Sequence, residues 1–148
     1  MTQGQLCDTL ISFFRDELHV VDLHVSSLMK PETVVSVGAV CNLAQGEEPV
    51  GHWESRRAPS DPDPTEGVDG FKKSTEFDPP VWVRDKRADG SDFVRFATRV
   101  EQWNARFKIY TTSGIRTTTG TLHLDDSDMN KAARFLVELT RKLAAIPE

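Results

Sequence analysis

The chain has 148 residues, of which 38% are apolar and 28% are charged, and its formal net charge is −5. This composition is typical of a soluble globular protein with a single domain, residues 1–148. No run approaches the ~20 apolar residues of a membrane-spanning helix, and the first residues lack the basic and apolar regions of a signal peptide. We therefore expect a cytoplasmic protein that does not bind a membrane.

The first 45 residues predict a helix followed by two strands. An apolar stripe at four-residue steps indicates an amphipathic helix over residues 5–18 that packs on a sheet: Leu6, Leu10, Phe14 and Leu18. Apolar and polar residues then alternate from Val21 to Val25, as in a strand with one buried face. The valine-rich residues 33–43 predict a second, more buried strand.

The two cysteines, Cys7 and Cys41, lie within the helix pattern and the second strand pattern. Cysteine in apolar surroundings behaves as a small buried hydrophobic residue, and disulfides are rare in a reducing cytoplasm. We therefore predict two buried free thiols, with a disulfide as the alternative.

Residues 46–80 differ from the rest of the chain. They contain six of the eight prolines and four of the nine glycines, and their net charge is −5. Proline-rich and acidic composition predicts a long polar loop, with Trp53, Phe71 and Phe77 as candidate anchors to the body of the protein. Such a loop either keeps an exposed connection solvated or binds a basic partner.

The second half predicts four strands and a closing helix. The strands are expected at residues 81–87, 93–103, 106–112 and 115–124, and the helix at residues 128–145 after the capping residues 125–128. Strands in runs with helices at both ends favour the α+β class. We predict an antiparallel sheet of five to six strands packed against N-terminal and C-terminal helices, with the long polar loop between the halves.

Charge is distributed unevenly along the chain. Residues 81–148 carry 12 Lys and Arg against 9 Asp and Glu, whereas residues 1–45 have a net charge of −3. A local basic face can bind a polyanion even when the net charge of the protein opposes it.

Strand alternation gathers basic and aromatic side chains of the second half on one face of the predicted sheet. Cations suit phosphates and aromatic rings suit stacked bases, so this face is a candidate surface for single-stranded nucleic acid. The alternatives are an ordinary solvated sheet face and a contact surface for an acidic protein. The candidate binding residues are Arg95, Arg99, Trp103, Arg106, Lys108, Tyr110 and Arg116.

Short motifs of the same region match a known pattern. They are Phe-Val-Arg-Phe at 93–96, Trp-Asn at 103–104, Arg-Phe-Lys-Ile-Tyr at 106–110 and Gly-Thr-Leu-His-Leu at 120–124, before the acidic start of a helix. Residues 93–143 resemble the single-stranded-DNA-binding domain of the transcriptional coactivator positive cofactor four. The resemblance implies four antiparallel strands backed by one helix, a homodimer, and single strands bound on the sheet. The chain departs from that pattern in its short 111–114 turn, its less basic strands and its additional N-terminal half.

No motif predicts catalysis: a nucleophile elbow, a phosphate-binding glycine loop and a zinc-protease motif are all absent from the sequence. We expect no enzyme activity, no catalytic residue and no cofactor. His19, Asp22 and His24 have a spacing that could supply metal ligands, but His19 falls off the face that the other two share, so we predict no metal site.

The alternative function is that of a protein-binding adaptor or inhibitor of the secretion-chaperone, immunity-protein or phage-inhibitor class. It would use the acidic loop or an exposed sheet edge. The expected partners are therefore single-stranded nucleic acid, another protein, or a second copy of the chain.

Overall fold

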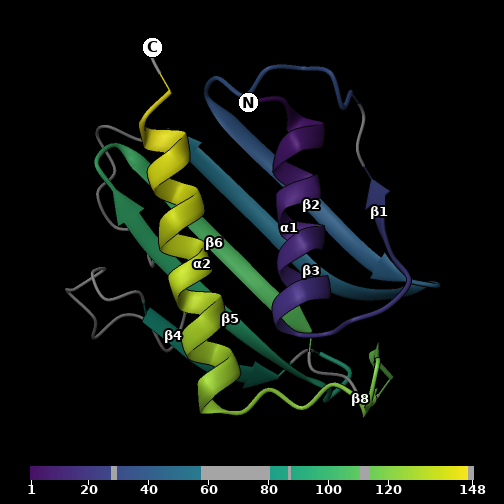
Figure 1. Cartoon of the computed structure of the whole chain (residues 1–148). Coiled ribbons are helices and arrows are strands. Elements are labelled where there is room, and N and C mark those ends of the chain that lie inside the picture. The colour runs from purple at the N-terminus through teal and green to yellow at the C-terminus, as the bar shows by residue number, and fades with distance from the viewer. Residues whose placement is uncertain (28–29, 58–80, 87, 111–113, 147–148) are drawn as a thin grey trace.

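The computed structural model describes residues 1–27, 30–57, 81–86, 88–110 and 114–146 (Figure 1). One antiparallel sheet has the strand order β1-β2-β3-β6-β5-β4, and two helices cover one of its faces. The α+β prediction with a six-stranded sheet and a helix at each end is confirmed. The elements of this body are α1 (Gln3–Glu17), β1 (Leu23–Ser27), β2 (Gly38–Gln45), β3 (Glu48–Arg57), β4 (Val81–Lys86), β5 (Asp92–Val100), β6 (Trp103–Tyr110) and α2 (Asp126–Ala144).

Both helices begin with a reciprocal cap. The Thr2 hydroxyl accepts a hydrogen bond from the Gln5 backbone N–H, and the Gln5 side chain accepts one from the Thr2 backbone N–H. Asp125 and Asp128 make the same exchange at the start of α2. Each exchange satisfies two backbone donors that a helix N-terminus leaves unpaired, which fixes where the helices start.

The core lies between the helices and the sheet. α1 packs mainly on β2, and α2 packs on β5 and β6. Phe107 of β6 is central, because its ring lies 5.8 Å from that of Phe14, 6.0 Å from Trp53 and 6.0 Å from Phe135. Aromatic pairs at these separations add to the stability that apolar burial alone provides.

Strand β3 corrects the prediction of a loop that begins at residue 46. Trp53 is fully buried as expected of an anchor, but it lies in a central strand rather than in a loop. Gly51 has a packing role: a Cβ atom there would lie 2.8 Å from Cζ of Phe14. The rest of the predicted loop, residues 58–80 with Phe71 and Phe77, lies outside the described residues.

Other element boundaries also differ from the prediction. The second strand begins at Gly38 and not at residue 33, and the hairpin turn between β5 and β6 falls at residues 101–102 and not at 104–105. The last predicted strand, residues 115–124, is instead a separate small hairpin of β7 (Arg116–Thr117) and β8 (Gly120–Thr121). Gly120, the first residue of β8 after the turn at 118–119, has a φ of 131°, a conformation that favours glycine.

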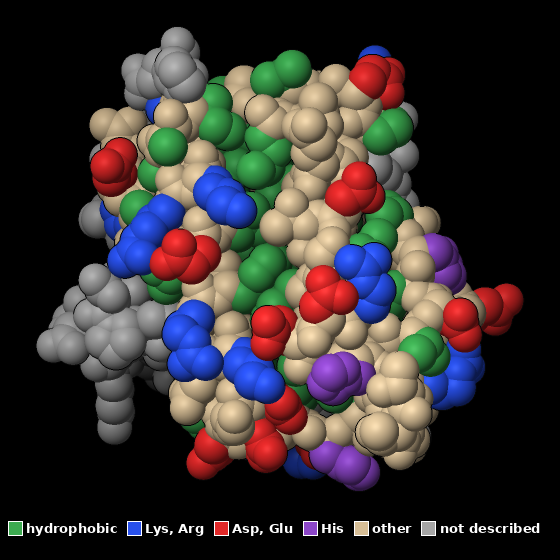
Figure 2. All heavy atoms as spheres, viewed as in Figure 1, with side chains coloured by type: hydrophobic (Ala, Val, Ile, Leu, Met, Phe, Trp, Pro, Cys, Tyr) green, Lys and Arg blue, Asp and Glu red, His purple; other side chains and the backbone are tan. Residues whose placement is uncertain are grey.

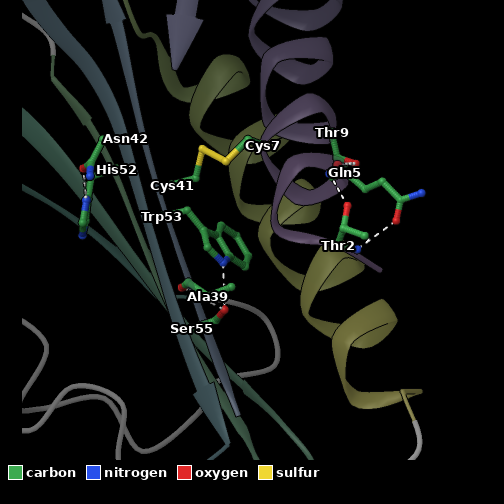
Figure 3. The surroundings of a disulfide bond; sticks show 10 residues. All are labelled: Thr2, Gln5, Cys7, Thr9, Ala39, Cys41, Asn42, His52, Trp53 and Ser55. Atoms are coloured by element: carbon green, nitrogen blue, oxygen red, sulfur yellow. Dashed lines mark hydrogen bonds between the residues drawn. A yellow bond between two sulfur atoms is a disulfide. The ribbon is translucent and has the colours of Figure 1, made fainter. Parts of the chain in front are cut away.

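Cys7 of α1 and Cys41 of β2 form a disulfide bond, so the prediction of free thiols is wrong (Figure 3). Their Cα atoms lie 5.7 Å apart, and both residues are at most 1% exposed. The bond ties the N-terminal helix to the sheet next to Trp53, which pairs with Cys41 across the β2–β3 ladder.

Candidate anion-binding face of the sheet

The face of the sheet that points away from the helices, called the outer face below, carries polar side chains from four strands. Successive residues of a strand point to opposite faces, and residues paired across strands share a face. Phe96 pairs with Phe107 and both belong to the core, so their neighbours along each strand point to the outer face. On strands β3 to β6, the outer-face residues with a charge or an imidazole are His52, Glu54, Arg56, Asp85, Arg95, Arg99, Arg106 and Lys108.

Most of the predicted binding residues share this face. Arg95 and Arg99 of β5 lie on it together with Arg106, Lys108 and Tyr110 of β6, as strand alternation predicts. Tyr110 is half-buried, and its ring lies 6.0 Å from that of Phe93, which is only 5% exposed.

Two predicted residues lie elsewhere. Trp103 pairs with Val100 on the helix side, is 1% exposed and lies beneath the Arg57 guanidinium, so the prediction that its ring faces outward is wrong. Arg116 belongs to β7, outside the main sheet, and its guanidinium lies 3.6 Å from the carboxylate of Asp22. The stacking surface on the outer face is therefore smaller than the sequence suggests.

Strand β3 contributes outer-face residues that the sequence analysis missed. His52, Glu54 and Arg56 alternate with the buried Gly51, Trp53 and Ser55, a period of two that indicates a half-buried strand. The prolines and charges around this stretch are typical of a loop, so the period of two was not recognised as a strand.

Positive charge exceeds negative charge on this face. Among the described outer-face residues of β3, β4, β5 and β6, five cations (Arg56, Arg95, Arg99, Arg106 and Lys108) face two carboxylates (Glu54 and Asp85). The whole chain has a net charge of −5, so the outer face is a local exception to an acidic protein.

Lys108 lies in the middle of these outer-face cations. It stands directly between His52 of β3 and Arg95 of β5 in the cross-strand row. Burial is the main cause that lowers the pKa of its ammonium; Arg95 lowers it further, Glu54 opposes the shift, and Arg106 adds a smaller lowering. The folded protein therefore holds this cation where its charge is disfavoured.

His52 adds little charge of its own. Burial is the main cause that lowers the pKa of its imidazole; Glu54 opposes the shift and Lys108 adds to it, so the ring is mostly neutral at pH 7. Its Nδ1 lies 2.5 Å from Oδ1 of Asn42, and its Nε2 lies 3.6 Å from the carboxylate of Glu54.

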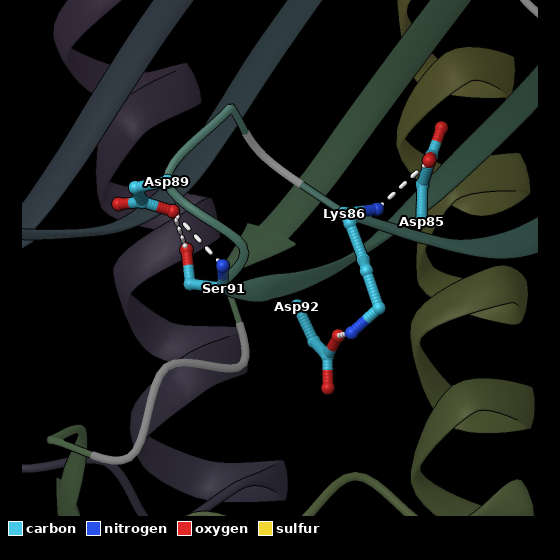
Figure 4. Close-up of polar contacts among 5 residues, drawn as sticks. All are labelled: Asp85, Lys86, Asp89, Ser91 and Asp92. Carbon is cyan, nitrogen blue, oxygen red and sulfur yellow. Dashed lines mark hydrogen bonds and ion pairs between the residues drawn. The ribbon is translucent and has the colours of Figure 1, made fainter.

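Arg95 is held in place from two sides. Its guanidinium lies 4.8 Å from the centre of the Phe93 ring and 3.2 Å from Oδ2 of Asp85. The other oxygen of Asp85 accepts a hydrogen bond from the Lys86 backbone N–H in the β4–β5 hairpin, where Lys86 also pairs with Asp92 (Figure 4). The Nε atom of Arg95 is buried and has no hydrogen-bond partner within the described structure.

A cavity of about 110 Å³ opens among these groups. Its polar lining comes from three adjacent strands, with the Phe96 and Phe107 positions completing the wall. The polar lining residues are His52, Glu54, Arg95, Arg106 and Lys108.

The structure also bears on metal binding and membranes. Within the described ranges, no group of three or more His, Cys, Asp or Glu side chains is arranged to hold a metal ion. His19 and Asp22 both have positive φ and bend the chain before β1, and Asp22 lies beside Arg116. None of the helices in this part of the chain is long and apolar enough to cross a membrane.

No known protein family matches this chain, and neither a curated protein nor a solved structure matches it. The resemblance to the positive cofactor four domain therefore remains a prediction from short motifs.

Proposed function

We propose that the protein is a non-enzymatic binding protein whose outer face holds single-stranded nucleic acid. The observation that supports this is the surplus of positive charge, five cations against two carboxylates, around a lysine whose charge is disfavoured in the free protein. Phosphates of a bound strand would offset both the burial and the neighbouring cations that disfavour the charge of Lys108. Arg95, Arg99, Arg106 and Lys108 contact phosphates in this proposal, and Tyr110 stacks on a base. Arg56 adds a cation from β3, in the cross-strand row of Asn104 and Arg99.

The test is fluorescence anisotropy with a short labelled single strand at a series of salt concentrations. Each lost phosphate contact should make the slope of log affinity against log salt shallower by roughly 0.7. We expect this change for Lys108→Met and no change for the matched control Lys142→Met, an exposed residue of α2 on the opposite face of the sheet. The double reversal Arg99→Glu with Lys108→Glu should abolish binding. Absence of binding to single-stranded DNA and RNA at low salt would refute the proposal.

A second candidate function, a protein-binding adaptor, is favoured by a groove of about 480 Å³ between α1 and α2. The Phe13 and Phe135 rings stack at 4.3 Å in its floor, and hydrophobic side chains are visible along the line between the helices (Figure 2). Asp16 and Glu17 line the α1 side, whereas Lys131 and Arg134 line the α2 side.

An amphipathic helix of a partner suits this groove, because its apolar stripe would contact the two phenylalanines and its flanking charges would oppose those of the walls. Affinity capture after nuclease treatment separates the two functions. A partner bound in the groove should be lost from Lys131→Glu with Arg134→Glu and retained by Lys108→Met. If the wild type, the Lys131→Glu/Arg134→Glu variant and Lys108→Met all captured the partner equally, the groove would be excluded as the interface.

The compartment and the oligomeric state also remain proposals. The Cys7–Cys41 disulfide favours an oxidising compartment over the cytoplasm that the sequence predicts, because disulfides are rare where glutathione keeps thiols reduced. Thiol alkylation in a non-reducing extract of the native cell distinguishes the two locations. Light scattering on the purified chain tests the homodimer that the family resemblance implies.

A further inference from the structure

We propose that the outer-face cavity binds a single phosphoryl group, with Arg95, Arg106 and Lys108 as its ligands. This inference rests on the proposed nucleic-acid function and assigns one phosphate of the bound chain to a defined position.

The size of the cavity is compatible with a phosphoryl group. Its volume of about 110 Å³ is several times the ~10–15 Å³ of cavity volume that one water molecule requires, so a group of a few heavy atoms fits. In this proposal the base attached to the bound phosphate lies outside the cavity, on the side of Tyr110.

The donors match the geometry of a phosphoryl group. Arg95 and Lys108 are direct cross-strand partners, and Arg106 lies two residues from Lys108 on the same face of β6. Guanidinium groups present paired donors that suit phosphate oxygens, and the lysine adds a compact charge. The buried Nε of Arg95 has no acceptor within the described residues, and an oxygen of the ligand would supply one.

Nearby carboxylates limit the charge of the ligand. Glu54 lines the cavity, and Asp85 binds Arg95 from the β4 side. Three cations and two carboxylates leave a surplus of one positive charge, because His52 is mostly neutral. That surplus matches a phosphodiester or a monobasic phosphate. The Glu54 side chain is 53% exposed and can turn toward solvent as the anion enters.

The first experiment titrates the full chain with inorganic phosphate at constant ionic strength and follows the ¹⁵N spectrum, including the Arg95 Nε–H signal. We expect a saturable shift of that signal at millimolar phosphate, about tenfold weaker binding in Lys108→Met, and retained binding in Lys108→Arg. Glu54→Gln should bind more tightly, and Lys142→Met, at an exposed position of α2, should behave as the wild type. An unmoved Arg95 Nε–H signal, or equal affinity in Lys108→Met, would overturn the inference.

The second experiment identifies the source of the phosphoryl group. Oligonucleotides with and without a 5′-phosphate are compared by anisotropy: tighter binding of the phosphorylated strand assigns the cavity to a chain end, and equal binding assigns it to an internal phosphodiester. If the oligonucleotides bind but inorganic phosphate does not, the cavity proposal fails while the proposed function stands. If phosphate alone binds, the nucleic-acid function fails and the cavity remains a site for a small phosphate.

Discussion

Removal of the Cys7–Cys41 disulfide should cost a large part of the stability of the fold. The two residues lie 34 apart in the sequence, and in the chain-entropy model closure of such a loop destabilises the unfolded state by about 4 kcal/mol. Domains of ordinary size are stable by only ~5–15 kcal/mol in total. We therefore expect Cys7→Ala with Cys41→Ala to remain folded at 25 °C but to unfold at a much lower urea concentration.

Urea unfolding followed by tryptophan fluorescence measures this effect, because the buried Trp53 lies directly opposite Cys41. With a urea m-value of roughly 2 kcal/mol/M, the midpoint should fall by about 2 M. The oxidised wild type with added reductant should show the same fall, and the double variant should not respond to reductant. Two titratable thiols in the purified protein, or equal midpoints with and without reductant, would refute the reasoning.

Three further predictions concern packing, pH and capping. Gly51→Ala should lower the free energy of unfolding by about 1–3 kcal/mol in urea melts, because the added Cβ would lie 2.8 Å from Cζ of Phe14 in a packed core. Burial lowers the pKa of His52 below 6.5, so its contribution to stability is present above pH 6.5 and is lost as the pH falls through its folded value. The melting temperature of His52→Asn should therefore fall less between pH 7 and pH 5 than that of the wild type or of the matched His24→Asn; equal slopes would contradict the assignment. Asp125→Ala should cost about 1 kcal/mol by removal of the α2 cap, and unchanged thermal melting would show that the cap contributes nothing.

The sequence predicts the elements whose hydrophobic period is regular. Both helices and strands β1, β4, β5 and β6 follow from periods of 3.6 or 2, because each buries one face, whereas β2 follows from a near-continuous apolar run rich in valine. Strand β3 was missed because Pro49, Gly51 and several charges are typical of loops. Gly51 is there for a tertiary reason, the approach of the Phe14 ring, which no local pattern reveals.

The misplacement of Trp103 has a local cause. Val100 and Trp103 pair across a two-residue turn, and this places both on the helix side of the sheet. Two-residue hairpin turns usually contain Asn-Gly or Asp-Gly, which identifies them in a sequence. Here Glu101 adopts a φ of 53° although it is not a glycine. Asparagine is typical of turns, so the turn was predicted at residues 104–105 instead of 101–102. This shift assigned Trp103 to the wrong face of the sheet.

The disulfide was missed for a different reason. Its two cysteines come from a helix and a strand whose packing is known only once the fold is known. Composition alone gives the cytoplasm as the default compartment, and a reducing cytoplasm favours free thiols. The pairing therefore depends on tertiary structure and not on any motif.

Lys108 provides the prediction that separates a binding face from an ordinary solvated one. Its pKa is lowered, so the penalty on folding is present at neutral pH and disappears as the pH rises toward 10.5, where the unfolded state also loses the proton. Lys108→Met keeps most of the length of the side chain and removes the charge. If the cation is retained for a ligand, this variant should melt at a higher temperature than the wild type at pH 7 and bind nucleic acid more weakly, a trade-off typical of functional sites. If this face is only solvated and binds no ligand, Lys108→Met should leave the affinity of the protein for nucleic acid unchanged. Lower stability together with unchanged binding would mean that Lys108 serves only the packing of the sheet.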